Sequence, residues 1–127
     1  MLATVLSLSA CSGPPGEFAE RVKLPSCGEL QLEVPFGMSR LPSKAVTCME
    51  QANSAPRGGE LVVTYPTLEG DPISMYFRLE PGDDALQVWE DTSEDKFGGD
   101  TDWTRYSCLD VADISKWYEG ECTFERF

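Results

Sequence analysis

The chain of 127 residues carries 22 acidic and 10 basic side chains and no histidine, which gives a net charge of −12 at neutral pH. This balance argues against nucleic-acid binding, which needs clustered Lys and Arg to displace counterions, and against an electrostatic contact with anionic lipid. The absence of histidine excludes Ser-His-Asp and Cys-His nucleophile pairs and a histidine-based zinc site.

The first ten residues, Met1 to Ala10, carry no charge and are followed by Cys11 and a Gly/Pro-rich stretch. Leu8-Ser9-Ala10-Cys11 places an apolar residue and two small residues before a cysteine, which resembles the lipobox of bacterial lipoproteins. The resemblance implies cleavage before Cys11 and a diacylglyceryl thioether, with palmitate-type chains, on its sulfur. Each CH₂ that these chains bury would contribute about 0.8 kcal/mol. We therefore expect a lipid anchor on the outer, extracytoplasmic face of a cell membrane.

A secretory signal normally opens with basic residues, and Met1-Leu2-Ala3-Thr4 has none. The alternative is a soluble protein with an apolar N-terminus. On the lipoprotein interpretation, residues 1–10 are a signal peptide, residues 11–26 a lipidated tether, and residues 27–127 one domain. At ~3.3–3.6 Å per residue, the tether would extend about 50 Å. Phe18 and Val22, four residues apart, allow one helical turn within it.

Four cysteines follow the tether, namely Cys27, Cys48, Cys108 and Cys122. An even number in an exported chain favours disulfides, and no pair has the C-x₂₋₄-C spacing of a zinc site. Of the three connectivities, we favour Cys27–Cys48 with Cys108–Cys122, because each joins elements that are near in sequence. Each bond would stabilise the fold by about 3 kcal/mol.

Hydrophobic periodicity predicts one helix and several strands. Leu30, Leu32 and Val34 alternate with polar residues, as in a short half-buried strand. Apolar residues recur at helical spacing in Lys44–Asn53, where Cys48 lies on the apolar face. The period then changes to two, which predicts strands over the segments 61–65, 73–79, 86–90, 103–108 and 117–124. The segment 109–115 is either a turn of helix or an irregular connection.

The connections between these strands are short, so neighbouring strands are expected to be antiparallel. We therefore predict an α+β fold in which a short helix packs on a four- to five-stranded antiparallel meander sheet, with two disulfides. Turn residues such as Glu69-Gly70-Asp71-Pro72 and Pro81-Gly82-Asp83-Asp84 mark the connections.

The order of these features resembles a set of small secreted actinobacterial lipoproteins. The shared features are the lipobox, Cys27-Gly28, the Pro-led helix, Thr67-x-Glu69-Gly70-Asp71-Pro72-Ile73 with Tyr76, and Phe97-Gly98, Trp103 and Cys108. The resemblance implies a fold and a location, and it brings no activity. A helix packed on a sheet with two disulfides is also similar in outline to the β-lactamase inhibitory proteins.

Acidic residues 91–102 have some of the spacing of a calcium loop, with Asp91, Ser93, Asp95 and Asp102 at positions one, three, five and twelve. Lys96 stands at position six, where a calcium loop needs glycine, so we expect a solvated acidic loop that binds no metal. A glycosidase needs two facing carboxylates in a concave site, which a domain of this size offers little room for. We expect neither an enzyme nor a cofactor.

If residues 73, 75, 77 and 79 face the helix, then Tyr76 and Arg78 face the other way, and Trp89 joins them. Aromatic and Arg side chains on an exposed sheet face are typical of a recognition surface. The alternative is that residues 109–117 fold over this face and bury it. We therefore expect a non-catalytic binding or interaction module for an envelope protein or a small ligand. The alternative is a small acidic inhibitor of a cell-envelope enzyme, which would offer the loop Asp91–Asp102 to a basic cleft.

Overall fold

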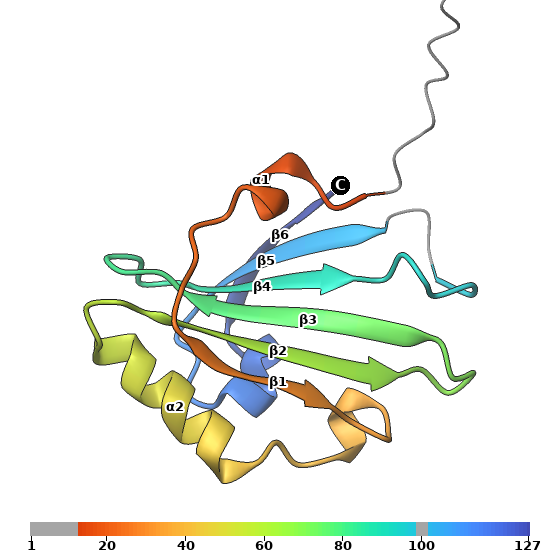
Figure 1. Ribbon diagram of the computed structural model, residues 1–127, viewed down its shortest axis with the longest axis horizontal. Helices are drawn as coiled ribbons and strands as arrows, with labels where there is room; N and C mark the ends of the chain where they lie inside the picture. Colours follow the sequence, from red (N-terminus) through yellow and green to blue (C-terminus); the bar gives the residue numbers. More distant parts are fainter. Residues whose placement is uncertain (1–12, 99–101) are drawn as a thin grey trace, which may run out of the picture.

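The computed structural model describes residues 13–98 and 102–127, so the predicted lipobox and Cys11 lie outside the described residues. Six strands form one sheet in the order in which they occur in the chain (Figure 1). The strands are β1 (Ser26–Gln31), β2 (Gly59–Pro66), β3 (Pro72–Leu79), β4 (Leu86–Asp91), β5 (Trp103–Leu109) and β6 (Glu121–Arg126), and the helices are α1 (Gly16–Ala19), η1 (Phe36–Met38), α2 (Ser43–Ser54) and η2 (Ile114–Glu119). The predicted α+β class is confirmed, with six strands in place of four to five.

Helix α2 packs on one face of the sheet through three small or flexible apolar side chains. Ala45, Met49 and Ala52 follow one another at i, i+4 and i+7, and all three are buried. Pro42 stands directly before the helix, where its fixed φ favours helical entry, and the chain turns extended at Ala55 before Pro56. The observed helix is one residue longer at each end than the predicted one.

The strand predicted from Leu30, Leu32 and Val34 is present as β1, which begins at Ser26 and ends at Gln31. It pairs with β2 in parallel, with Leu30 opposite Val63, because the chain crosses over through α2 before it returns to the sheet. The expectation of an entirely antiparallel sheet is therefore wrong at this edge. The crossing is tight, since a Cβ on Gly59 would lie 2.7 Å from the Cβ of Ala52. Only glycine at position 59 lets the helix approach β2 this closely.

Strands β2 to β6 form the predicted antiparallel meander. Alternate residues of each strand face α2 and fill the main core, with Phe77 and Val88 directly opposite one another at its centre and both fully buried. Helix η2 closes the same face with Ile114 and Trp117. It takes up the end of the segment that the sequence left ambiguous and also the first residues of the strand predicted over 117–124. That prediction is wrong there because Trp117 turns into the core as part of η2, and the strand β6 begins only at Glu121. Figure 1 shows α2 and η2 together on this side of the sheet.

Both predicted disulfides are confirmed. Cys27–Cys48 ties β1 to the middle of α2, and Cys108–Cys122 joins directly opposed residues of β5 and β6. Their loops of 21 and 14 residues would each stabilise the fold by about 3 kcal/mol in the chain-entropy account. The first bond fixes the crossover helix, and the second fixes the edge hairpin.

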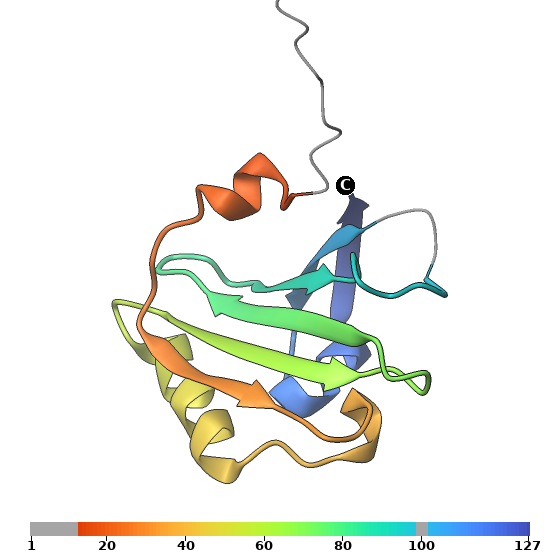
Figure 2. The same cartoon turned by 45° about the vertical axis from the view of Figure 1, so that its right-hand side comes forward.

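The other face of the sheet is covered in part by residues 16–25, which we call the strap. Phe18 of α1 is buried between Tyr76, Trp89 and Trp103, with ring centroids 4.6, 5.5 and 4.6 Å away. Figures 1 and 2 both show α1 on the side of the sheet opposite α2. The predicted tether therefore does not stand clear of the domain, because from Gly16 onward it packs against the sheet.

Candidate functional site

The residues predicted to form an exposed recognition surface lie mostly beneath the strap. Arg78 and Trp89 are 1% and 2% exposed, and Tyr76 is half-buried. The prediction of an exposed surface is therefore wrong for Arg78 and Trp89. The covering segment is also not the one considered as the alternative, since residues 109–117 pack on the opposite face with η2.

The Arg78 guanidinium is held in a network of charges under the strap. It forms an ion pair with Glu60, which lies directly opposite on β2, and a second, at 3.4 Å, with Glu80. It also donates a hydrogen bond of 2.6 Å to the carbonyl oxygen of Val22 in the strap. Glu60 additionally accepts from Arg21 at 3.1 Å. Arg78 therefore joins the strap to the sheet, which is a structural role.

A signal for this arrangement is present in the sequence. Phe18 is followed three residues later by a cation, Arg21, which lies on the same side of a helical turn. Arg21 lies over the Phe18 ring at 3.9 Å, which is a cation–π contact. Glu17 of the same turn pairs with Arg105 on β5. Such a pattern, an aromatic residue with an acid and a base close to it in the sequence, indicates a segment that docks on the domain.

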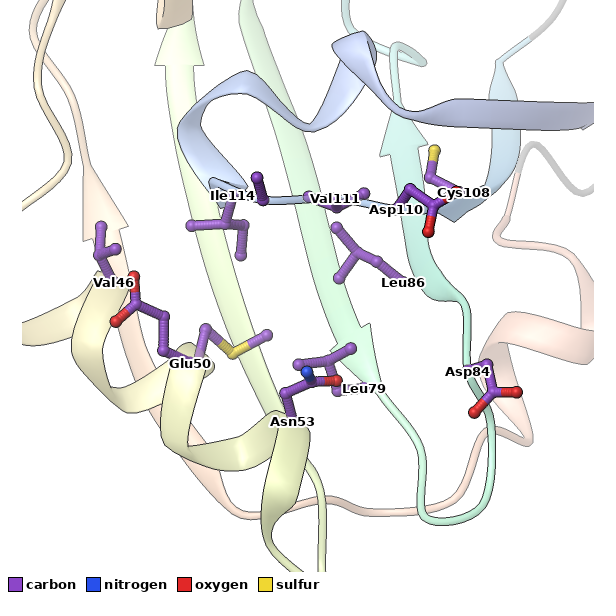
Figure 3. A pocket seen from close by; sticks show the side chains of 12 residues that line it. Val46, Glu50, Asn53, Leu79, Asp84, Leu86, Cys108, Asp110, Val111 and Ile114 are labelled. Atoms are coloured by element: carbon purple, nitrogen blue, oxygen red, sulfur yellow. The ribbon is translucent and has the colours of Figure 1, made fainter.

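A different hollow, on the α2 side of the sheet, is the candidate functional site. We call it the cleft. It has a volume of about 380 Å³, which is within the range of small-ligand pockets. Its walls come from α2, the ends of β3, β4 and β5, and the segment 110–114 that leads into η2 (Figure 3). The lining residues are Val46, Met49, Glu50, Asn53, Leu79, Asp84, Leu86, Cys108, Asp110, Val111, Ala112 and Ile114.

The floor of the cleft is apolar. Met49, Leu86 and Ile114 belong to the main core and are buried, yet they also line the cleft. Figure 3 shows Leu86 and Ile114 near the middle of the view. Such a floor would accept the methylene or methyl groups of a ligand.

The rim of the cleft is acidic. Glu50 on α2, Asp84 before β4 and Asp110 after β5 surround the apolar floor (Figure 3). None of the three carboxylates has a hydrogen bond or ion pair to another described residue. Within residues 13–98 and 102–127, no group of three His, Cys, Asp or Glu side chains is gathered closely enough to hold a metal ion. The three rim carboxylates are therefore spread around the opening.

The acidic loop at Asp91–Asp102 lies at one end of the sheet, and its residues 99–101 fall outside the described residues. In the described part, Asp91 and Asp95 accept hydrogen bonds from the backbone N–H groups of Ser93 and Phe97 and so form local turns. The inhibitor function of this loop stays a prediction.

Glu90 is a half-buried carboxyl on the α2 side of β4, near Tyr65 and Tyr106, with no hydrogen bond to another described residue. Burial raises the pKa of Glu90 above its ordinary value of 4.5. Burial also raises the pKa of Tyr65 and Tyr106, and the charge of Glu90 adds to both effects. This group is therefore less stable as a carboxylate in the folded protein than in the unfolded chain.

This shift predicts a pH dependence of stability. Because the pKa of Glu90 is higher in the folded protein than in the unfolded chain, protonated Glu90 contributes to the free energy of unfolding. This contribution is fully present below about pH 4.5, and it is lost as the pH rises through the pKa of the folded protein. Glu90→Gln should therefore raise the free energy of unfolding at pH 7 and flatten its pH dependence above pH 4.5. Urea denaturation at a series of pH values tests this, with the exposed Glu94→Gln as control. Equal pH profiles for Glu90→Gln and wild type would contradict it.

The chain matches no protein-family model, no curated protein and no solved structure. In the part of the chain that the structure describes, no helix is long and apolar enough to cross a bilayer. The indication of function therefore comes from the geometry and charge of the cleft.

Proposed function

We propose that the protein is a membrane-anchored extracytoplasmic lipoprotein that acts as a non-catalytic binding module, with the cleft as its binding surface. The observation that carries the binding proposal is an apolar floor of core side chains surrounded by three unpaired carboxylates. The anchor is supported by the lipobox-like sequence Leu8-Ser9-Ala10-Cys11.

The chemistry of the cleft favours a basic side chain of an envelope protein as its ligand. The methylene stem of Lys or Arg would lie on Met49 and Leu86, and its charged head would reach the rim. Attraction between the −12 charge of the chain and a basic partner would also speed encounter. The volume of about 380 Å³ suits one side chain with its flanking atoms.

The anchor is tested by intact-mass measurement of the protein from the membrane fraction of cells that express the full chain. We expect a chain that begins at Cys11 and carries the mass of acyl chains, and Cys11→Ser should move the protein to the soluble fraction. An unmodified wild-type mass, together with soluble behaviour of both proteins, would contradict the proposal.

The cleft is tested by NMR titration of the protein with the peptide acetyl-Leu-Lys-Leu-amide. Weak binding, on the order of a millimolar, should shift the amides of residues 46–53 and 110–114 and should weaken as salt is raised. The triple variant Glu50→Gln, Asp84→Asn and Asp110→Asn should lose this binding.

Two controls isolate the charge of the ligand and the place where it binds. The same peptide with norleucine in place of Lys has the stem without the charge and should not bind measurably. The exposed Glu94→Gln and Glu119→Gln lie outside the cleft lining and should leave binding unchanged. Equal binding of the Lys and norleucine peptides, or of the triple variant and wild type, would contradict the cleft proposal.

A further inference from the structure

A second hollow lies beside the first turn of α2, and it differs from the cleft in charge. Its volume is about 510 Å³, and its walls come from η1 with the residues that follow it, the start of α2, and η2 with the residue before it. Figures 1 and 2 show these three segments together on the α2 side of the sheet. The lining residues are Phe36, Gly37, Ser39, Arg40, Leu41, Ser43, Val46, Thr47, Asp113, Ser115, Lys116 and Tyr118.

Two basic side chains line this hollow in a chain that has 22 acids and only 10 bases. Arg40 and Lys116 form no ion pair with a carboxylate of the described residues. The acid in the lining, Asp113, is already engaged, because it accepts hydrogen bonds of 3.0 Å from the Ser115 amide and 2.7 Å from the Ser115 hydroxyl. These hydrogen bonds and the charge of Lys116 lower the pKa of Asp113. The lining therefore carries two bases and one acid, a net charge of +1 in a chain of net charge −12.

Hydrogen-bond donors without partners are present at the N-terminus of α2, whose first residue lines the hollow. Pro42 precedes α2 and supplies no side-chain cap, and the amides of Ser43 and Lys44 donate to no described residue. Ser43 and Thr47 add two hydroxyl groups to the lining. Free amides at a helix N-terminus, hydroxyls and cations together form the donor set that binds a phosphate.

We propose that this hollow, which we call the basic hollow, binds a phosphate group, either free or as the monoester of a small molecule. Arg40 and Lys116 would pair with its negative charge, and the first amides of α2 would donate to its oxygens. The half-buried Phe36 and the exposed Tyr118 line the remaining space, which exceeds what one phosphate fills, and they would contact an organic part. Val46 lines both the basic hollow and the cleft, yet this proposal does not depend on the cleft function.

The test is an NMR titration of the protein with inorganic phosphate and, separately, with glycerol 3-phosphate. Both ligands should shift the amides of Ser43 and Lys44 and saturate, whereas glycerol and sodium chloride of equal ionic strength should not. Tighter binding of glycerol 3-phosphate assigns the basic hollow to a phosphorylated small molecule, and equal binding assigns it to free phosphate. Shifts that sodium chloride reproduces, or that fail to saturate, would overturn the proposal.

Matched variants test whether phosphate binds in the basic hollow. Arg40→Gln and Lys116→Gln should each weaken phosphate affinity about tenfold, as expected when a charged donor to an anion is removed. Arg57→Gln removes the same charge beyond the other end of α2 and should leave affinity unchanged. Both test residues are exposed, so thermal unfolding should show that the variants stay folded. Equal losses in all three variants would indicate nonspecific attraction and would overturn the site.

Discussion

Phe18→Ala is expected to lower the free energy of unfolding by about 4 kcal/mol, as measured by urea denaturation. Phe18 is 6% exposed and is the strap side chain that fills the space between Trp89 and Trp103. Alanine would leave a cavity in this small second core, and neighbouring side chains could close it only by moving the strap. Because both tryptophans would gain water contact, their fluorescence should shift to longer wavelength before the domain unfolds.

Val22→Ala is the matched control within the same strap. Its side chain is 64% exposed, so truncation should change the free energy of unfolding by less than about 0.5 kcal/mol. If Phe18→Ala were as stable as wild type, with unchanged tryptophan emission, the strap would not be part of the folded domain.

Glu60→Gln is expected to cost a similar amount, about 4 kcal/mol, for a different reason. It removes the carboxylate that lies opposite Arg78 in the β2–β3 register and pairs with it. Arg78 is 1% exposed and would keep only Glu80, at 3.4 Å, as a counter-charge. A buried charge that loses its main partner is strongly destabilising, more so than the pair itself is stabilising.

The double variant Glu60→Leu, Arg78→Met separates these two effects. With both charges replaced by apolar side chains of similar size, the free energy of unfolding should recover most of the loss seen in Glu60→Gln. Arg21 would also lose its partner, but it is partly exposed and can turn to water. A double variant as unstable as Glu60→Gln would show that packing, and not the unpaired charge, sets the cost.

The parts of the fold that the sequence predicts well are those with a regular hydrophobic period. Helix α2 and strands β2 to β4 each turn apolar residues toward the main core at intervals of 3.6 or 2 positions, and these intervals reveal both the type and the orientation of the element. The disulfide pairing was predicted from the proximity of the cysteines in the sequence. The prediction is correct because consecutive strands are neighbours in the sheet, so segments that are close in sequence are also close in space.

The docking of the strap and the parallel pairing of β1 were not predicted, because neither follows from a hydrophobic period. The strap docks through a single buried ring and a few charged groups, and its Gly/Pro-rich start is typical of a linker. Strand β1 shows weak alternation, and nothing local distinguishes parallel from antiparallel pairing. Burial of Arg78 and Trp89 follows from the strap and was missed with it.

The cleft and the basic hollow were also not predicted, for a topological reason. The cleft gathers residues from three segments that are more than twenty positions apart in the chain, such as Glu50, Asp84 and Asp110, and the basic hollow joins residues 36–47 to residues 113–118. No short motif joins these residues. Only the packing of α2 and η2 side by side on the sheet brings them together.

The docked strap also sets how far the domain can move from the point at which its N-terminus is held. Helix α1 begins at Gly16, so five residue steps separate Cys11 from this helix, and at ~3.6 Å each they span at most about 18 Å. A domain fixed to a bilayer through Cys11 would therefore stay close to the lipid headgroups. Its connection to the membrane would be much shorter than the predicted tether of about 50 Å. The strap and the cleft lie on opposite faces of the sheet. A short connection through the strap would therefore leave the cleft on the other face of the domain, open to partners in the surrounding medium.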